Sequence, residues 1–231
     1  MGIMKYENVC DGVFIERPNR FIAYVTVDGK RETVHVKNTG RCRELLLPGV
    51  SVLLEKASNP DRKTPYDLIG VWKANLGWVN IDSQAPNRVM KEWLALHDYD
   101  RIQPEYTYGR SRIDFYLEKR GEPDAPVERI LLEVKGCTLE MDGEGYFPDA
   151  PTERGIKHLK ELAAAVSQGY RCVLAFVIPM EGVRVVHANV ATHPEFGTAL
   201  QEAQAAGVEI WYLPCRVERD SLEITERIIA E

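Results

Sequence analysis

The chain has 231 residues, enough for one large domain or two small ones with a buried core. Hydrophobic residues make up 45% and charged residues 28%, as in ordinary globular proteins, and no apolar run approaches the ~20 residues that a membrane helix needs. The net charge of −6 is uneven: residues 1–80 hold 12 Lys and Arg against 9 Asp and Glu, and the rest of the chain holds 17 against 26. This asymmetry indicates that the two halves do different work.

The five cysteines are scattered and include no CxxC pair, which argues against a disulfide framework and a zinc site. The first residues lack a charged start followed by an apolar stretch, so no secretion signal is expected. Together these features predict a cytoplasmic protein without a membrane segment.

The first third of the chain is typical of short strands separated by turns. Asp28-Gly29 is a strong hairpin signal between two alternating segments. Five strands are expected, and a small five-stranded barrel most often has the OB topology. We therefore predict an OB-like β-barrel in residues 1–82, with strands in RFIAYVTVDG, RETVHVKN, PGVSVLLEKA, YDLIGVWKA and GWVNID.

Strands and helices alternate in the remaining two thirds, which predicts an α/β domain with a central mixed sheet in residues 83–231. A helix is expected from Asn87, as N-cap, to about Tyr99. The segment from Thr152 to Gly169 has one apolar stripe and a glycine end, and residues 194–207 form a third helix. The strands between them are SRIDFYLEKRG, ERILLEVKG, RCVLAFVIP and VEIWYLPC.

One strand ends in an acid and a base that share a face. Glu133 and Lys135 are two residues apart, so both side chains point to the same side of the sheet. Asp114 lies on the preceding strand, and the polar loop between the two strands favours an antiparallel hairpin. The two carboxylates are then expected to meet at one margin of the sheet.

Paired carboxylates repel unless a cation lies between them or one takes up a proton. Oxygen ligands favour a hard cation such as Mg²⁺ or Mn²⁺, and a lysine beside it can orient water or stabilise charge on a phosphoryl group. The simpler interpretation is a solvated strand end with a surface ion pair worth ~0–1 kcal/mol.

Several segments together are similar to the sugar fermentation stimulation protein family, from about Arg17 to Val217. These are VHVKNTGRCRELLLPG, YGRSRIDF, LLEVKG, FPDAPTERGIKHLKEL and HPEFGTALQEAQAAGVEI. The resemblance implies an OB-like N-terminal domain, a PD-(D/E)xK nuclease-like C-terminal domain and DNA binding. Asp114, Glu133 and Lys135 then take the positions of the two acids and the lysine, with Ile113 where the superfamily has proline.

Glu105, upstream in QPEYTYG, lies where related nucleases often place another acid, and is a further candidate metal ligand alongside Asp114 and Glu133. An exposed glutamate before a strand is the alternative.

Basic residues mark two candidate nucleic-acid-binding regions. One lies in the first domain, where aromatic residues nearby could also stack on bases. The other is the start of the long helix, where Thr152, Arg154 and His158 lie on the polar side near free backbone amides and could hold backbone phosphates or orient the site. For this second region the alternative is a solvated helix face. The basic residues of the first region, in the first domain, are Arg17, Arg20, Lys37, Arg41 and Arg43.

Three functions remain open at this point. The first is a magnesium-dependent (or manganese-dependent) nuclease acting on DNA and possibly RNA, with Asp114 and Glu133 on the metal and Lys135 assisting water. The second is a non-catalytic DNA-binding regulator of sugar metabolism genes that keeps the nuclease fold. The third, supported only by the acidic net charge, is a small-molecule enzyme unrelated to nucleic acid.

Overall fold

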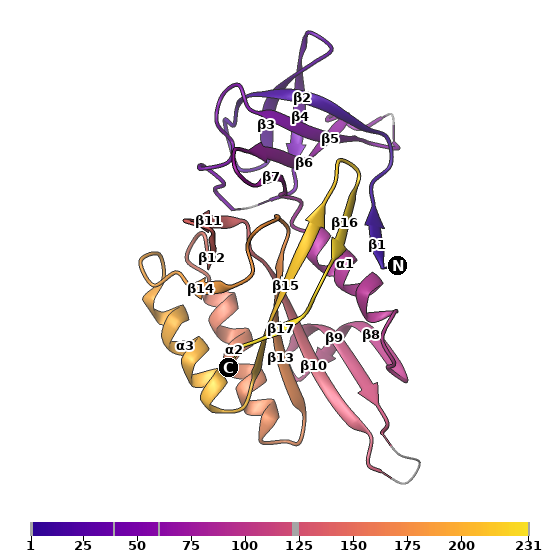
Figure 1. Cartoon of the computed structure of the whole chain (residues 1–231), viewed down its shortest axis with the longest axis vertical. Helices are drawn as coiled ribbons and strands as arrows, with labels where there is room; N and C mark the ends of the chain where they lie inside the picture. Colours follow the sequence, from indigo (N-terminus) through magenta and orange to yellow (C-terminus); the bar gives the residue numbers. More distant parts are fainter. Residues whose placement is uncertain (1, 39, 60, 122–124, 231) are drawn as a thin grey trace.

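The computed structural model describes residues 2–38, 40–59, 61–121 and 125–230, and shows a small barrel joined to a larger layered domain (Figure 1). The barrel lies at the top of the view, and the larger sheet extends below it with helices on its two faces. No helix in these ranges is long and apolar enough to cross a bilayer.

The barrel is a sheet in the order β4-β3-β2-β5-β6-β7 that closes because β4 also pairs with β6 in parallel. The ring that closes is OB-like, as predicted, and consists of β2, β3, β4, β5 and β6. Its strands differ from the expected five: β2 was not predicted, and the strand predicted in GWVNID is β7, which pairs with β6 outside the closed ring. Alternating valines and leucines fill its interior, with Val25, Val34, Leu54 and Leu68 fully buried. The strands are β2 (Val9–Glu16), β3 (Ile22–Val27), β4 (Lys30–Val36), β5 (Ser51–Lys56), β6 (Tyr66–Lys73) and β7 (Gly77–Asn80).

The first residues of the chain do not belong to the barrel, contrary to the expectation for residues 1–82. Strand β1 (Ile3–Lys5) pairs antiparallel with β16 (Ser221–Ile224) at the edge of the larger sheet. A strand of three residues has no periodicity of its own, so only its tertiary partner determines where it lies. The chain therefore starts in the second domain, enters the barrel and returns.

The larger sheet is mixed, in the order β1-β16-β15-β13-β10-β9-β8, with β17 also paired to β15. Strands β10, β13 and β15 run parallel in its centre, and β8 and β9 are antiparallel neighbours on one side. The remaining bounds are β8 (Arg101–Tyr108), β9 (Ser111–Lys119), β10 (Glu128–Gly136), β13 (Arg171–Ile178), β15 (Glu209–Val217) and β17 (Ile228–Ile229).

Helices cover both faces of this sheet, which explains why its central strands are continuously apolar. Alternate residues of β10 enter different cores: Leu132 packs with α1, and Leu131 packs with α2 and α3. A three-stranded sheet lies between the barrel and the helices α2 and α3, beside the large sheet (Figure 1). These elements are α1 (Ala85–Leu94), α2 (Glu153–Val166), α3 (Pro194–Ala205), β11 (Leu139–Met141), β12 (Glu144–Phe147) and β14 (Val186–Ala188).

Helix α1 begins earlier than Asn87, which was expected to be its N-cap. Proline is well tolerated in a first turn, and Pro86 occupies that position. The Asp82 carboxylate accepts a hydrogen bond from the Gln84 amide (2.9 Å), which stabilises the start of the helix. Asn87 is thereby free to use its side chain elsewhere.

Candidate functional site

Asp114 and Glu133 lie at the point where β9 and β10 separate. The two strands pair up to Leu132 and Phe115, and the next residues in this register are Glu133 and Asp114. There the ladder gives way to a side-chain contact: the Asp114 Oδ2 accepts a hydrogen bond from the Val134 amide (2.8 Å). The predicted antiparallel neighbours are therefore present, and their acids meet at one margin.

Glu133 is buried, with 2% of its surface exposed, and its two carboxylate oxygens differ. Oε1 is bound by the Lys135 ammonium (2.5 Å) and by Nδ1 of His158. Oε2 is buried and has no hydrogen-bond partner among the described residues. A carboxylate oxygen left without a donor is costly, and a ligand is one way to satisfy it.

The two acids have opposite pKa shifts. Burial and the neighbouring Glu133 charge raise the pKa of Asp114, although Val134 and Asn87 donate to it. Burial would also raise the pKa of Glu133, but the hydrogen bond from His158 and the charge of Lys135 lower it overall. A second negative charge at this margin is therefore unfavourable even with the Lys135 ammonium beside Glu133.

Asn87 reaches the site from α1, and sequence reasoning missed it. Its side-chain amide donates to Oδ1 of Asp114 (2.8 Å). With both Asp114 oxygens accepting hydrogen bonds, the carboxylate is held in one orientation. The sequence contains no signal for this contact, since Asn87 fits a helix cap equally well.

These residues fit a hard divalent cation. Mg²⁺ is usually held by one or two carboxylates together with water and substrate phosphate, and Asp114 and Glu133 supply that number. Within the described ranges no group of three His, Cys, Asp or Glu residues is arranged to hold a metal ion. Glu105 does not complete such a group: it is exposed, and its carboxylate lies 3.3 Å from the Arg112 guanidinium.

Helix α2 supplies His158 from its first two turns. His158 was expected to contact nucleic acid or orient the site, with a solvated helix face as the alternative, and the structure shows it buried and pointing at Glu133. Its Nε2 accepts a hydrogen bond from Nε of the exposed Arg154 (3.4 Å). Thr152 is the N-cap, and its hydroxyl accepts from the Gly155 amide (3.0 Å). His158 is thus placed to orient Glu133, and Thr152 stabilises the helix that carries it.

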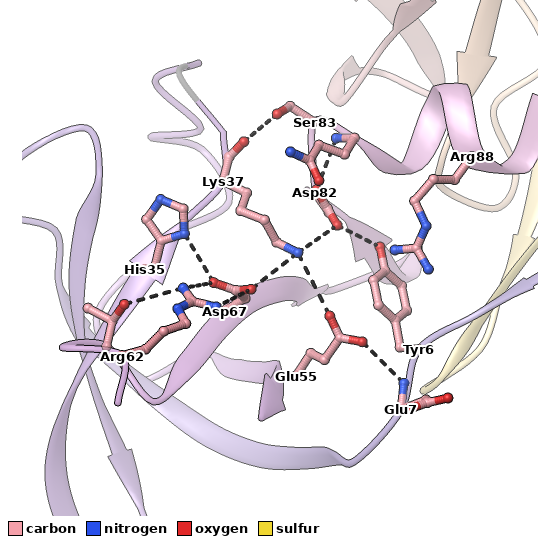
Figure 2. Close-up of polar contacts among 12 residues, drawn as sticks. Tyr6, Glu7, His35, Lys37, Glu55, Arg62, Asp67, Asp82, Ser83 and Arg88 are labelled. Atoms are coloured by element: carbon pink, nitrogen blue, oxygen red, sulfur yellow. Dashed lines mark hydrogen bonds and ion pairs between the residues drawn. The ribbon is translucent and has the colours of Figure 1, made fainter. Parts of the chain in front are cut away.

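Two of the five basic residues expected to contact nucleic acid instead form ion pairs or hydrogen bonds with other groups of the protein. The Lys37 ammonium lies within 3.8 Å of Glu55 and 3.3 Å of both Asp67 and Asp82 (Figure 2). We call these four residues the Lys37 cluster. The Arg17 guanidinium donates to four backbone carbonyls at 2.6–2.9 Å, those of Arg20, Asn38, Gly40 and Arg41.

The other three basic residues line one groove, which Arg17 also lines. Arg20, Arg41 and Arg43 are exposed and surround a cavity of about 760 Å³ between the barrel and the segment just before α2. We call this cavity the arginine groove. Its remaining lining includes Phe14, Leu46, Pro48, Ala150 and Pro151.

Comparisons with known proteins place the chain in a two-domain class with an OB barrel at the N-terminal side. Residues 15–81 match the family model described as "SfsA N-terminal OB domain", and residues 84–221 match "Sugar fermentation stimulation protein RE domain". The chain belongs to this family, the sugar fermentation stimulation (SfsA) proteins.

Similar proteins cover almost the whole chain. The sugar fermentation stimulation protein homolog from Desulfitobacterium hafniense DCB-2 is 51% identical to it, over 95% of this chain and 95% of that one. The homolog from Clostridium beijerinckii is 48% identical, over 97% of this chain and 98% of that one. The solved structure of Pyrococcus furiosus SfsA in complex with Ca²⁺ has a TM-score of 0.83 and 24% identity, covering 97% of this chain and 96% of that one. The last likeness supports the fold.

Proposed function

We propose that this protein is a Mg²⁺- or Mn²⁺-dependent nuclease that hydrolyses phosphodiester bonds in DNA, and possibly in RNA. The observation that carries the proposal is the convergence of Asp114, Glu133 and Lys135 at one sheet margin, with Oε2 of Glu133 buried and without a donor. A surface ion pair does not account for a Glu133 that is almost fully buried.

Each side chain has a distinct role in this reaction. Asp114 and Glu133 would hold the ion, which when bound supplies a more acidic water and stabilises charge on the phosphate. Lys135 lies beside Glu133 and can orient the attacking water or offset charge as it develops on the phosphoryl oxygens. Water adds to phosphorus, the ester P–O bond breaks, and the departing oxygen takes up a proton. The P. furiosus relative, described in complex with Ca²⁺, shows that a protein of this fold can bind a hard divalent ion.

The test is cleavage of labelled oligonucleotides by the full chain. Single- and double-stranded DNA and RNA are incubated with Mg²⁺, Mn²⁺ or EDTA, using the parent, Asp114→Asn and Lys135→Met. Asp98→Asn is the matched control, because Asp98 is an exposed acid on the loop after α1. We expect cleavage only with metal, unchanged in the control and reduced by about 10²-fold or more in the two site variants. Equal cleavage by Asp114→Asn and the parent would exclude this site.

A DNA-binding regulator without turnover is the second candidate. It is favoured by the arginine groove, whose cationic rim can bind phosphates without the carboxylates. Under this alternative the protein binds DNA, and its affinity falls steeply as the salt concentration rises, but neither Mg²⁺ nor Mn²⁺ gives any cleavage.

A further inference from the structure

We infer that the arginine groove is a binding site for a single strand of nucleic acid and feeds it toward the carboxylate site. The inference deepens the proposed function by naming its substrate class, and rests on that function for the cleavage step alone. Binding in the groove needs neither Asp114 nor a metal. The groove and the catalytic proposal can therefore be tested separately.

The guanidinium groups on the rim of the groove carry charge that is not neutralised by an ion pair with any described residue. Among the described residues Arg20, Arg41 and Arg43 make no ion pair, although the chain carries a net charge of −6. Glu16, the acid in the lining, is paired with Arg31 (2.9 Å). Three unpaired guanidiniums on one concave surface favour a polyanion, because each can contact a phosphate without breaking an existing ion pair.

Apolar side chains lie among the arginines in the lining of the groove. Phe14 and Leu46 are buried there, and Pro48 and Pro151 lie nearby in the lining. Next to Arg20 the ring of Phe21 is 52% exposed, with the Arg20 guanidinium 5.9 Å from its centre. Apolar and aromatic surfaces beside arginines suit unstacked bases, which a single strand offers and a duplex keeps inside. The combination therefore favours a single strand.

The loop that carries two of the arginines is held in place before any ligand binds. Arg17 binds the carbonyls of Gly40 and Arg41, and the Arg41 amide donates to Oδ2 of Asp149 (3.1 Å). These contacts tie the barrel loop to the second domain. A preorganised loop loses little conformational entropy on binding, so its arginines contribute more to affinity.

The groove is joined to the candidate active site through α2. Pro151 in its lining directly precedes the N-cap of α2, Thr152. Arg154, in the first turn, is exposed and contacts His158, which in turn contacts Glu133. Arg154 is thus a fourth cation between the groove and the two acids. A strand bound at the barrel has a cationic route along the start of α2 to the scissile position.

The decisive variant removes the rim charges from the full chain. Arg20, Arg41 and Arg43 are replaced together by Gln in an Asp114→Asn background, which prevents cleavage during the measurement. The matched control replaces three other exposed cations, Lys91, Lys119 and Arg120, by Gln, so that the net charge changes equally. Binding of fluorescein-labelled dT20, U20 and a 20-base-pair DNA duplex is measured by fluorescence anisotropy without metal at several salt concentrations. Thermal melting checks that both triple variants fold.

The expected result is about tenfold or greater loss of dT20 and U20 affinity in the rim variant, and little change in the control. The slope of log affinity against log salt concentration should become less negative by about 2, because three phosphate contacts are lost and each contributes about 0.7 to the slope on a single strand. Equal losses in rim and control variants would overturn the inference, as would tighter binding of the duplex than of either single strand. If rim-dependent binding is found but the parent cleaves nothing, the groove stands and the nuclease proposal fails.

Discussion

At the scale of single residues, the asymmetry of Glu133 is the most informative feature of the site. Two donors, from Lys135 and His158, converge on Oε1, and none among the described residues reaches Oε2. Lys135 and His158 thereby leave Oε2 as the oxygen that would face a metal ion under the proposed function. His158 is buried and both its ring nitrogens make contacts, so under that proposal it would act through Glu133 as a positioning residue.

Replacing His158 tests this role. His158→Leu removes the donor to Glu133, and His158→Asn keeps a side-chain N–H close to the place of Nδ1. Loss of an outer partner of a metal ligand typically weakens metal affinity by about 10–100-fold. We expect that loss for Mn²⁺ binding to His158→Leu, measured by electron paramagnetic resonance titration, with substantial recovery in His158→Asn. Parent-like Mn²⁺ affinity in His158→Leu would show that the histidine only fills space.

At the scale of elements, α2 connects the groove to the site, and its N-cap is the feature to test. Thr152 was a candidate for nucleic-acid contact, and the structure shows its hydroxyl accepting from the Gly155 amide. Thr152→Ala should lower the free energy of unfolding by about 1 kcal/mol, and Thr152→Ser should keep most of it. Urea unfolding measures both. If Thr152→Ala instead weakened dT20 binding without changing stability, the hydroxyl would be a nucleic-acid contact.

The elements also show how far the sequence alone reaches. Helix α2 was predictable because its apolar stripe and its glycine end at Gly169 are local signals, whereas the capping role of Thr152 was not among the predictions. The pairing of β9 with β10 was predictable from a short polar connection and strand alternation. Strand β1 was not, because its partner β16 comes from the other end of the chain.

Tertiary contacts likewise hid part of the site. Asn87 meets Asp114 only because α1 packs across β10, and Lys37 meets three acids that come from β5, β6 and the linker after β7. A single sequence gives the residue types of such clusters but not which of them come together. For that reason Lys37 and Arg43 looked equivalent in the sequence, although one is enclosed by carboxylates and the other is exposed.

At the scale of the whole molecule, the Lys37 cluster joins the two domains. Asp67 belongs to the barrel, and Asp82 to the linker that enters α1. The Tyr6 hydroxyl, next to β1 of the large sheet, donates to Asp82 (3.3 Å), as Figure 2 shows. A second contact between the domains, from Lys73 to Glu140, lies between β6 and β11. The barrel and the larger sheet are thereby expected to unfold together.

Acid should weaken this joint through Asp67. Burial alone would raise the pKa of Asp67, but hydrogen bonds from Arg62 and His35 and the charge of Lys37 lower it to about 2, from an ordinary value of 3.8. Because the folded pKa is the lower one, the stabilisation is complete above about pH 4 and is lost as the pH falls toward 2. A shift of this size corresponds to about 2 kcal/mol at neutral pH.

Asp67→Asn removes this contribution and therefore its pH dependence. The variant should be less stable than the parent at pH 7, and the difference should shrink as the pH is lowered from 5 to 3, because the parent loses what the variant never had. Urea unfolding followed by tryptophan fluorescence at each pH measures it, with Asp98→Asn as the exposed control. If the difference stays constant down to pH 3, Asp67 stabilises the joint through packing and neutral hydrogen bonds instead of its charge. Between pH 5 and 3, only the ionised carboxylate of Asp67 would make the stability difference depend on pH.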